Sequence, residues 1–89
     1  MDAELVVDGN ALAGVFGELF QHEMTIARGT CGGCGMVGPL AEARVYAEAP
    51  GAVARCPGCS SVLFTIVKGG GRYWLGFDQL RCLEIHAVD

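Results

Sequence analysis

Charge is scarce in this sequence. Charged residues make up 18% of its 89 residues, whereas roughly 25% is usual for a domain. Hydrophobic residues make up 52%, and a chain this small leaves roughly a third of its unfolded-state surface exposed after folding. Some apolar side chains must therefore remain at the surface, and we expect a homo-oligomer or a protein partner. The alternative is that eleven alanines raise the hydrophobic fraction without creating an adhesive surface.

Long apolar runs and a basic, apolar start are also missing. No stretch approaches the roughly 18 consecutive apolar residues of a membrane span, so we expect no membrane segment. The opening MDAELVVDGN is acidic and is unlike a secretory signal. We therefore expect a cytoplasmic protein. Structural disulfides are disfavoured in a reducing cytoplasm, where spaced cysteine pairs more often hold a metal.

Cysteine is the one reactive residue type that is abundant. Cys31-Gly-Gly-Cys34 and Cys56-Pro-Gly-Cys59 are separated by 21 residues. Each pair can wrap a tight turn around one ion, and two such turns supply the four thiolates that tetrahedral zinc accepts. Gly35 suits a positive φ after the first turn, and the ring of Pro57 presets φ in the second. The sequence predicts one Zn²⁺ per chain, held by Cys31, Cys34, Cys56 and Cys59.

Two other uses of the same thiols remain open. Four thiolates also bind iron, and the CxxCG…CPxC pattern resembles rubredoxin, which would make the chain an electron-transfer protein. A thioredoxin-type dithiol requires a helix that begins at the first cysteine, and the glycines around Cys31 disfavour one. A closed site of four cysteines leaves no position for an activated water, so we do not expect an enzyme.

The residues outside the two pairs add little chemistry. His22 and His86 are not needed as ligands when four thiols are available, and Ile26 stands where a zinc-protease motif would place its second histidine. Cys82, between apolar neighbours, is predicted to be a buried small hydrophobe.

Nucleic-acid binding is an alternative function that the charge disfavours. It would use five cations together with three aromatic stacking surfaces. The cations are Arg28, Arg44, Arg55, Lys68 and Arg72, and the aromatic residues are Tyr46, Tyr73 and Trp74. The formal net charge is −4, and four thiolates with one Zn²⁺ add −4 + 2 = −2, which gives −6 for the loaded protein. That charge repels phosphate, so we expect no nucleic-acid partner.

The two cysteine turns, TCGGCG and RCPGCS, each followed by strand-like sequence, resemble the knuckles of the zinc ribbon fold. Together with DGNALAG near the start and RYWL near the end, they make nearly the whole chain similar to an uncharacterised family of small bacterial proteins, a domain of unknown function. The resemblance implies a zinc ribbon preceded by a helix and implies no activity. Many second knuckles carry glycine after the last cysteine, where this sequence has Ser60.

The hydrophobic pattern predicts a single α+β domain over residues 1–89. Residues 1–9 form a short strand or arm, and 10–26 form an amphipathic helix capped by Asn10, which Gly14 and Gly17 weaken. Residues 27–89 form the four-cysteine zinc ribbon of antiparallel β-hairpins. Its predicted strands cover 40–49, 52–55, 61–67, 72–77 and 82–85.

Overall fold

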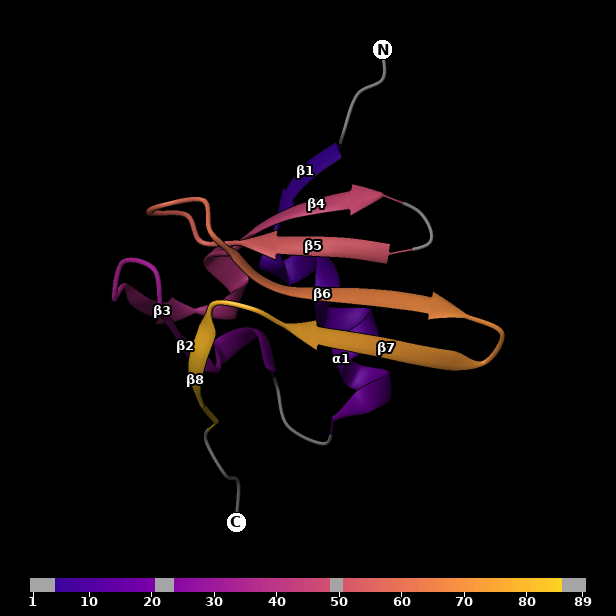
Figure 1. Cartoon of the computed structure of the whole chain (residues 1–89). Coiled ribbons are helices and arrows are strands. Elements are labelled where there is room, and N and C mark those ends of the chain that lie inside the picture. Colours follow the sequence, from indigo (N-terminus) through magenta and orange to yellow (C-terminus); the bar gives the residue numbers. More distant parts are fainter. Residues whose placement is uncertain (1–4, 21–23, 49–50, 86–89) are drawn as a thin grey trace.

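A five-stranded antiparallel sheet forms most of the molecule (Figure 1). The computed structural model describes residues 5–20, 24–48 and 51–85. The β6–β7 hairpin closes through Gly70 and Gly71, both at positive φ (58° and 76°), as a tight two-residue turn requires. In sheet order the strands are β1 (Leu5–Asp8), β4 (Arg44–Glu48), β5 (Gly51–Arg55), β6 (Val62–Gly69) and β7 (Arg72–Phe77).

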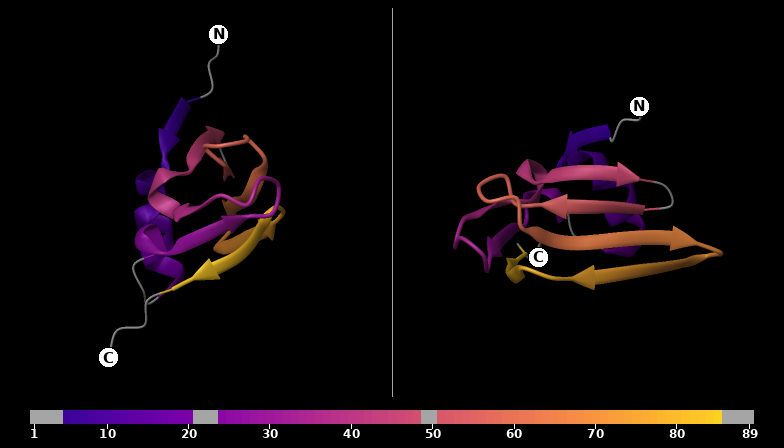
Figure 2. Two further views of the ribbon diagram at one scale, coloured as in Figure 1. Left: turned by 90° about the vertical axis from the view of Figure 1, so that its left-hand side faces the viewer. Right: turned by 45° about the horizontal axis from the view of Figure 1, so that its top comes forward.

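A second, three-stranded antiparallel sheet lies at one end of the first (Figure 2). The chain passes from the large sheet to the small one through residues 78 and 79, whose amides donate to the carbonyls of Leu63 and Val62 at 2.9 Å each. These bonds hold the connection between the two sheets against β6. In sheet order the strands are β3 (Val37–Pro39), β2 (Arg28–Cys31) and β8 (Leu80–Glu84).

Short helical segments cover one face of the five-stranded sheet (Figures 1 and 2). They are η1 (Gly9–Leu12), α1 (Ala13–Leu19), η2 (Met24–Ile26) and η3 (Leu40–Glu42). Val45, Ala54 and Phe64 stand opposite one another on neighbouring strands and are all buried. Phe16 of α1 packs on Phe64 with ring centroids 6.1 Å apart. The helical face of the sheet is therefore the core face, and Cys31 and Cys56 belong to the same apolar cluster.

The helix predicted over 10–26 is wrong in length and in its cap. α1 ends at Leu19, because Phe20 is extended (φ −129°, ψ 151°), and Met24–Ile26 form a separate 3₁₀ turn. Two glycines cost the helix about 1 kcal/mol each relative to alanine, and turning at Phe20 allows Met24 to enter the core. The side chain of Asp8, rather than Asn10, caps the first turn by accepting the Asn10 amide at 3.0 Å.

The predicted strands are largely confirmed. Residues 5–8 of the expected arm form β1, and the 72–77 hairpin strand has the predicted bounds. The strand expected over 40–49 begins only at Arg44, because Leu40–Glu42 form a 3₁₀ turn that buries Leu40. Within the described ranges, no helix has both the length and the apolar character needed to cross a membrane.

Candidate metal centre

The two cysteine turns meet at the same end of the molecule (Figure 1). The first joins β2 to β3 and the second joins β5 to β6, so each lies at the tip of an antiparallel hairpin. The Sγ atoms of Cys31, Cys34, Cys56 and Cys59 all lie within 4.8 Å of one another. None of the four cysteines is in a disulfide.

The sulfur spacing fits a tetrahedral metal. The distances from Cys31 Sγ to Cys59 Sγ and from Cys34 Sγ to Cys56 Sγ are both 3.7 Å. A tetrahedron with metal–sulfur bonds of about 2.3 Å has edges of about 3.8 Å. Each of these short edges joins one sulfur of the first turn to one of the second. The four thiols can therefore hold a metal ion that links the two hairpins.

Backbone hydrogen bonds shape the first turn around its sulfur. The Cys31 amide donates to the Met36 carbonyl at 2.9 Å, and the Gly35 amide donates to the Cys31 carbonyl at 2.8 Å. The Gly33 amide lies 3.3 Å from Cys31 Sγ and points at it. A backbone N–H of the turn thus donates to one of the sulfurs that could bind a metal.

The second turn repeats this pattern. The Cys56 amide donates to the Ser61 carbonyl and the Ser60 amide to the Cys56 carbonyl, both at 2.9 Å. The Gly58 amide again lies 3.3 Å from the sulfur of the first cysteine, Cys56. The two turns therefore have the same backbone hydrogen bonds, and each places its first cysteine sulfur against a backbone amide. Two loops that are distant in sequence thus contribute matching pairs of sulfurs to one cluster.

The residue after each turn adopts a left-handed conformation. Gly35 has φ 79°, as predicted, and Ser60 has φ 66° in the equivalent place. A residue with a Cβ pays roughly 1–2 kcal/mol for this conformation, whereas glycine does not. The second turn therefore carries strain that the first turn avoids.

Ser60→Gly is expected to stabilise the metal-loaded protein by about 0.5–1 kcal/mol, because the left-handed strain outweighs the entropy of the added glycine. The Arg55 side chain donates to the backbone carbonyl of Ser60 at 2.9 Å, and glycine retains this bond. Gly35→Ser, the reverse change at the equivalent position of the first turn, is the control and should lower the free energy of unfolding. Denaturant unfolding at fixed free metal measures both free energies of unfolding. A lower free energy of unfolding in Ser60→Gly would contradict the claim that the left-handed conformation of Ser60 is strained.

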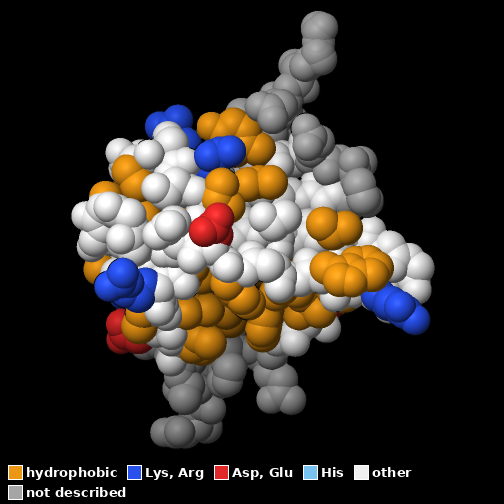
Figure 3. All heavy atoms as spheres, viewed as in Figure 1, with side chains coloured by type: hydrophobic (Ala, Val, Ile, Leu, Met, Phe, Trp, Pro, Cys, Tyr) orange, Lys and Arg blue, Asp and Glu red, His pale blue; other side chains and the backbone are white. Residues whose placement is uncertain are grey.

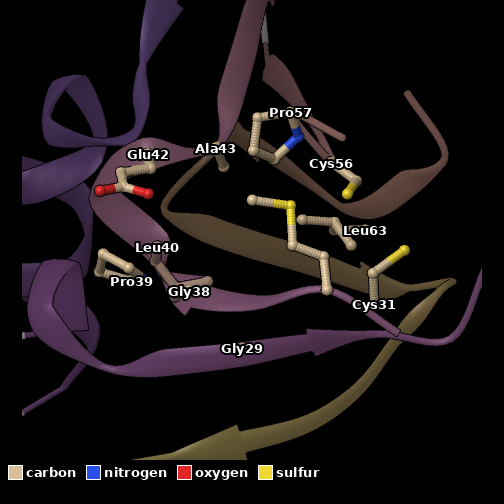
Figure 4. A pocket seen from close by; sticks show the side chains of 11 residues that line it. Gly29, Cys31, Gly38, Pro39, Leu40, Glu42, Ala43, Cys56, Pro57 and Leu63 are labelled. Carbon is tan, nitrogen blue, oxygen red and sulfur yellow. The ribbon is translucent and has the colours of Figure 1, made fainter. Parts of the chain in front are cut away.

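The first cysteine of each pair is buried and the second is exposed. Cys31 and Cys56 expose 3% and 1% of their surface, and Cys34 and Cys59 face solvent. Behind the buried pair lies a cavity of about 30 Å³. Figure 4 shows Cys31 and Cys56 at one end of it and Glu42 at the other. A cavity of this volume holds about two water molecules.

The two exposed thiols, Cys34 and Cys59, differ in pKa. Hydrogen bonding with the Ser61 side chain, whose Oγ lies 3.2 Å from Cys59 Sγ, and with the Ser61 backbone amide lowers the pKa of Cys59 to about 6. The Met36 amide lowers the pKa of Cys34, but the Cys56 thiol, partial desolvation and the two remaining thiols together raise it to about 11. Crowded thiolates repel one another, and a divalent cation removes that repulsion. The cluster is therefore suited to a cation. Sequence reasoning missed Ser61, which only its place two residues after Cys59 could have indicated.

Cys82 is exposed on β8, and the prediction that it is buried is wrong. Thr30 pairs with Cys82, but Cys31 pairs with Leu80, so Arg81 is an extra residue in the ladder. This bulge reverses the alternation of faces, so that Cys82 turns outward while Leu83 packs against the core. Cys82 is not part of the sulfur cluster. His22 and His86 lie outside the described residues.

The cations and aromatic rings considered for nucleic acid are in part engaged within the protein. Lys68 lies 3.7 Å from Glu18 and 5.4 Å from the centre of the Tyr73 ring, and the Tyr73 hydroxyl donates to Glu18. Arg55 lies 5.6 Å from the centre of the Tyr46 ring. These side chains hold one another at the surface.

Two antiparallel sheets joined at four converging cysteines define a small α+β domain with a candidate metal centre. The family model of DUF6510, a family of unknown function, matches residues 1–88, and the chain belongs to that family. Comparison with curated proteins found no match, and comparison with solved structures found none. The membership confirms the predicted resemblance to a family of unknown function.

Proposed function

We propose that this chain is a zinc ribbon module of the bacterial cytoplasm, in which one Zn²⁺ held by Cys31, Cys34, Cys56 and Cys59 stabilises a surface for protein association. The observation that carries the proposal is the convergence of four Sγ atoms, within 4.8 Å, from the tips of two antiparallel hairpins. Paired cysteine turns at two hairpin tips are the arrangement that defines a ribbon. In this reading the chain is a binding module and not an enzyme.

The proposed role of the metal is structural. Four thiolates complete a tetrahedral zinc site, which leaves no coordination position for a reacting water. Two of the ligands, Cys31 and Cys56, are members of the hydrophobic core, so a bound ion would tie the hairpin tips to that core. The cavity beside them has room for about two water molecules.

Protein association is supported by apolar side chains at the surface. Phe77 is 63% exposed, Ile26 56% and Trp74 52%, although large apolar side chains are usually buried in a stable domain. Phe77 and Trp74 lie on the same strand, β7. A partner that covered this region would remove that apolar surface from water.

An iron electron-transfer protein is the second candidate, and one observation favours it. Cys34 and Cys59 face solvent, so an iron bound here would lie near the surface, where an electron can reach it. The two candidates share all four ligands and differ in the metal.

The metal bound in cells separates them. Protein produced in medium that contains both zinc and iron, and purified in air without chelators, should be colourless with one zinc per chain by elemental analysis. Cys82→Ala is the matched control and should bind the same amount of zinc, because Cys82 is outside the cluster. One iron per chain with visible thiolate-to-iron absorption would instead support electron transfer. Free thiols with no bound metal would contradict both functions.

A further inference from the structure

Strand β7 leaves one side of its backbone without a partner. It is the last strand of the five-stranded sheet, and among the described strands it pairs only with β6. In Figures 1 and 2 no other described strand runs along its outer side. An edge of this kind presents a row of N–H and C=O groups that another strand can bind.

An apolar groove lies beside this edge. It has a volume of about 100 Å³, and none of its lining residues is charged or polar. Hydrophobic side chains form a continuous band along the lower part of the molecule in Figure 3, under the large sheet. The groove is lined by Phe16, Phe20, Met24, Leu40, Phe64, Leu75, Phe77, Leu80, Leu83 and Ile85.

We propose that the β7 strands of two copies of this chain pair antiparallel about a twofold axis at Leu75, which extends the sheet across a homodimer. This proposal rests on the proposed function of protein association and identifies the partner as a second copy of the chain. It does not depend on which metal is bound. In this register Leu75 faces Leu75 of the second copy, Trp74 faces Gly76, Tyr73 faces Phe77, and Arg72 faces Asp78.

Charge complementarity selects this register. Arg72 and Asp78 are both exposed, and neither has an ion-pair partner within the described ranges. A twofold axis at Leu75 places each Arg72, the first residue of β7, opposite an Asp78, the residue that directly follows β7, once beside each end of the shared ladder. Shifting the axis to any other residue of β7 separates these two charges. Opposite charges across a ladder stabilise pairing, and like charges oppose it.

The side chains also fit on both faces of the extended sheet. Tyr73, Leu75 and Phe77 lie on the α1 side, since Tyr73 binds Glu18 and the other two line the groove. Pairing brings the two grooves side by side and covers both copies of Phe77. On the other face, Trp74 lies across from Gly76, beside which there is open space. An aromatic ring that covers a glycine on a neighbouring strand is a stabilising cross-strand pair.

A charge swap tests the pairing directly. Sedimentation of the zinc-loaded chain should give twice its 9.3 kDa mass. Arg72→Asp and Asp78→Arg each place two like-charged pairs across the ladder and should raise the dimer dissociation constant roughly tenfold or more. The double variant Arg72→Asp/Asp78→Arg restores both pairs and should restore the dimer. Arg44→Asp, an equal charge change at an exposed position of the inner strand β4, should have little effect on the dimer.

Metal content and circular dichroism, measured on every variant, separate this proposal from that of the metal centre. A chain that stays monomeric at the highest concentrations reached while holding one metal ion would overturn the proposed homodimer. The proposed metal centre would stand, and the β7 edge would bind a different protein or none. A dimer that ignores both single charge reversals, or that the double variant fails to restore, would also overturn the pairing at Leu75. Restored dimerisation in the double variant supports it, because among the described residues Arg72 and Asp78 form no ion pair with each other within one chain.

Discussion

Replacing Cys56 with alanine should release the metal and unfold the protein. Cys56 is 1% exposed and belongs both to the sulfur cluster and to the core. Formation of a structural zinc site contributes on the order of 10 kcal/mol, and whole domains are stable by only about 5–15 kcal/mol. Losing one of the four ligands should therefore remove most of the free energy of unfolding of this 89-residue chain. Elemental analysis and far-ultraviolet circular dichroism measure the two losses.

Cys82→Ala is the matched control, since it removes the same sulfur from an exposed position on an edge strand. Its free energy of unfolding should change by no more than about 0.5 kcal/mol, as for other surface substitutions. A chelator added to the unaltered protein should reproduce the spectrum of Cys56→Ala. If Cys56→Ala kept a cooperative thermal transition while Cys82→Ala unfolded, the ligand set would be wrong.

The sulfur cluster was predictable because the pattern that indicates it, two C-x-x-C pairs, lies in short stretches of sequence. Each pair of cysteines is separated by two residues, and the spacing alone forces both sulfurs of a pair to one turn. The positive φ of Gly35 followed from the same local logic. The geometry adds the repeated amide-to-sulfur contacts of Gly33 and Gly58, which make the two turns equivalent.

The helix was predicted too long because its end is decided by distant contacts. Apolar spacing continues from Leu12 to Ile26, yet the helix stops at Leu19 so that Met24 can pack in the core. The order of strands in the large sheet has the same origin. β1 pairs with β4, about forty residues later in the chain. No local pattern specifies such a pairing.

The burial of Cys82 was mispredicted for a different reason. Strict alternation places Cys82 on the same face as Leu80, and the sequence around it gives no sign of an interruption. The bulge at Arg81 shifts every later residue of β8 to the opposite face. One extra residue in a ladder is enough to expose a side chain that the pattern assigns to the core.

The second large effect is expected at Gly9, where two segments of the chain meet without room for a side chain. Gly9 is buried at the start of η1, and a Cβ added there would overlap the backbone carbonyl of Leu40 in η3. The neighbour is backbone, so no rotamer change can relieve the overlap, and η3 connects the first cysteine hairpin to β4. Gly9→Ala should therefore lower the free energy of unfolding by roughly 3 kcal/mol, at the upper end of overpacking effects. Denaturant unfolding of the metal-loaded protein measures it.

Gly17→Ala is the matched control within the same region. Gly17 is exposed in α1, and an added Cβ would meet nothing within 4 Å. Alanine is favoured over glycine inside a helix by about 1 kcal/mol, so this variant should be more stable than the unaltered protein. The same glycine-to-alanine change should thus lower the free energy of unfolding at Gly9 and raise it at Gly17. Equal effects at Gly9 and Gly17 would show that η1 and η3 do not pack as closely in solution as this contact requires.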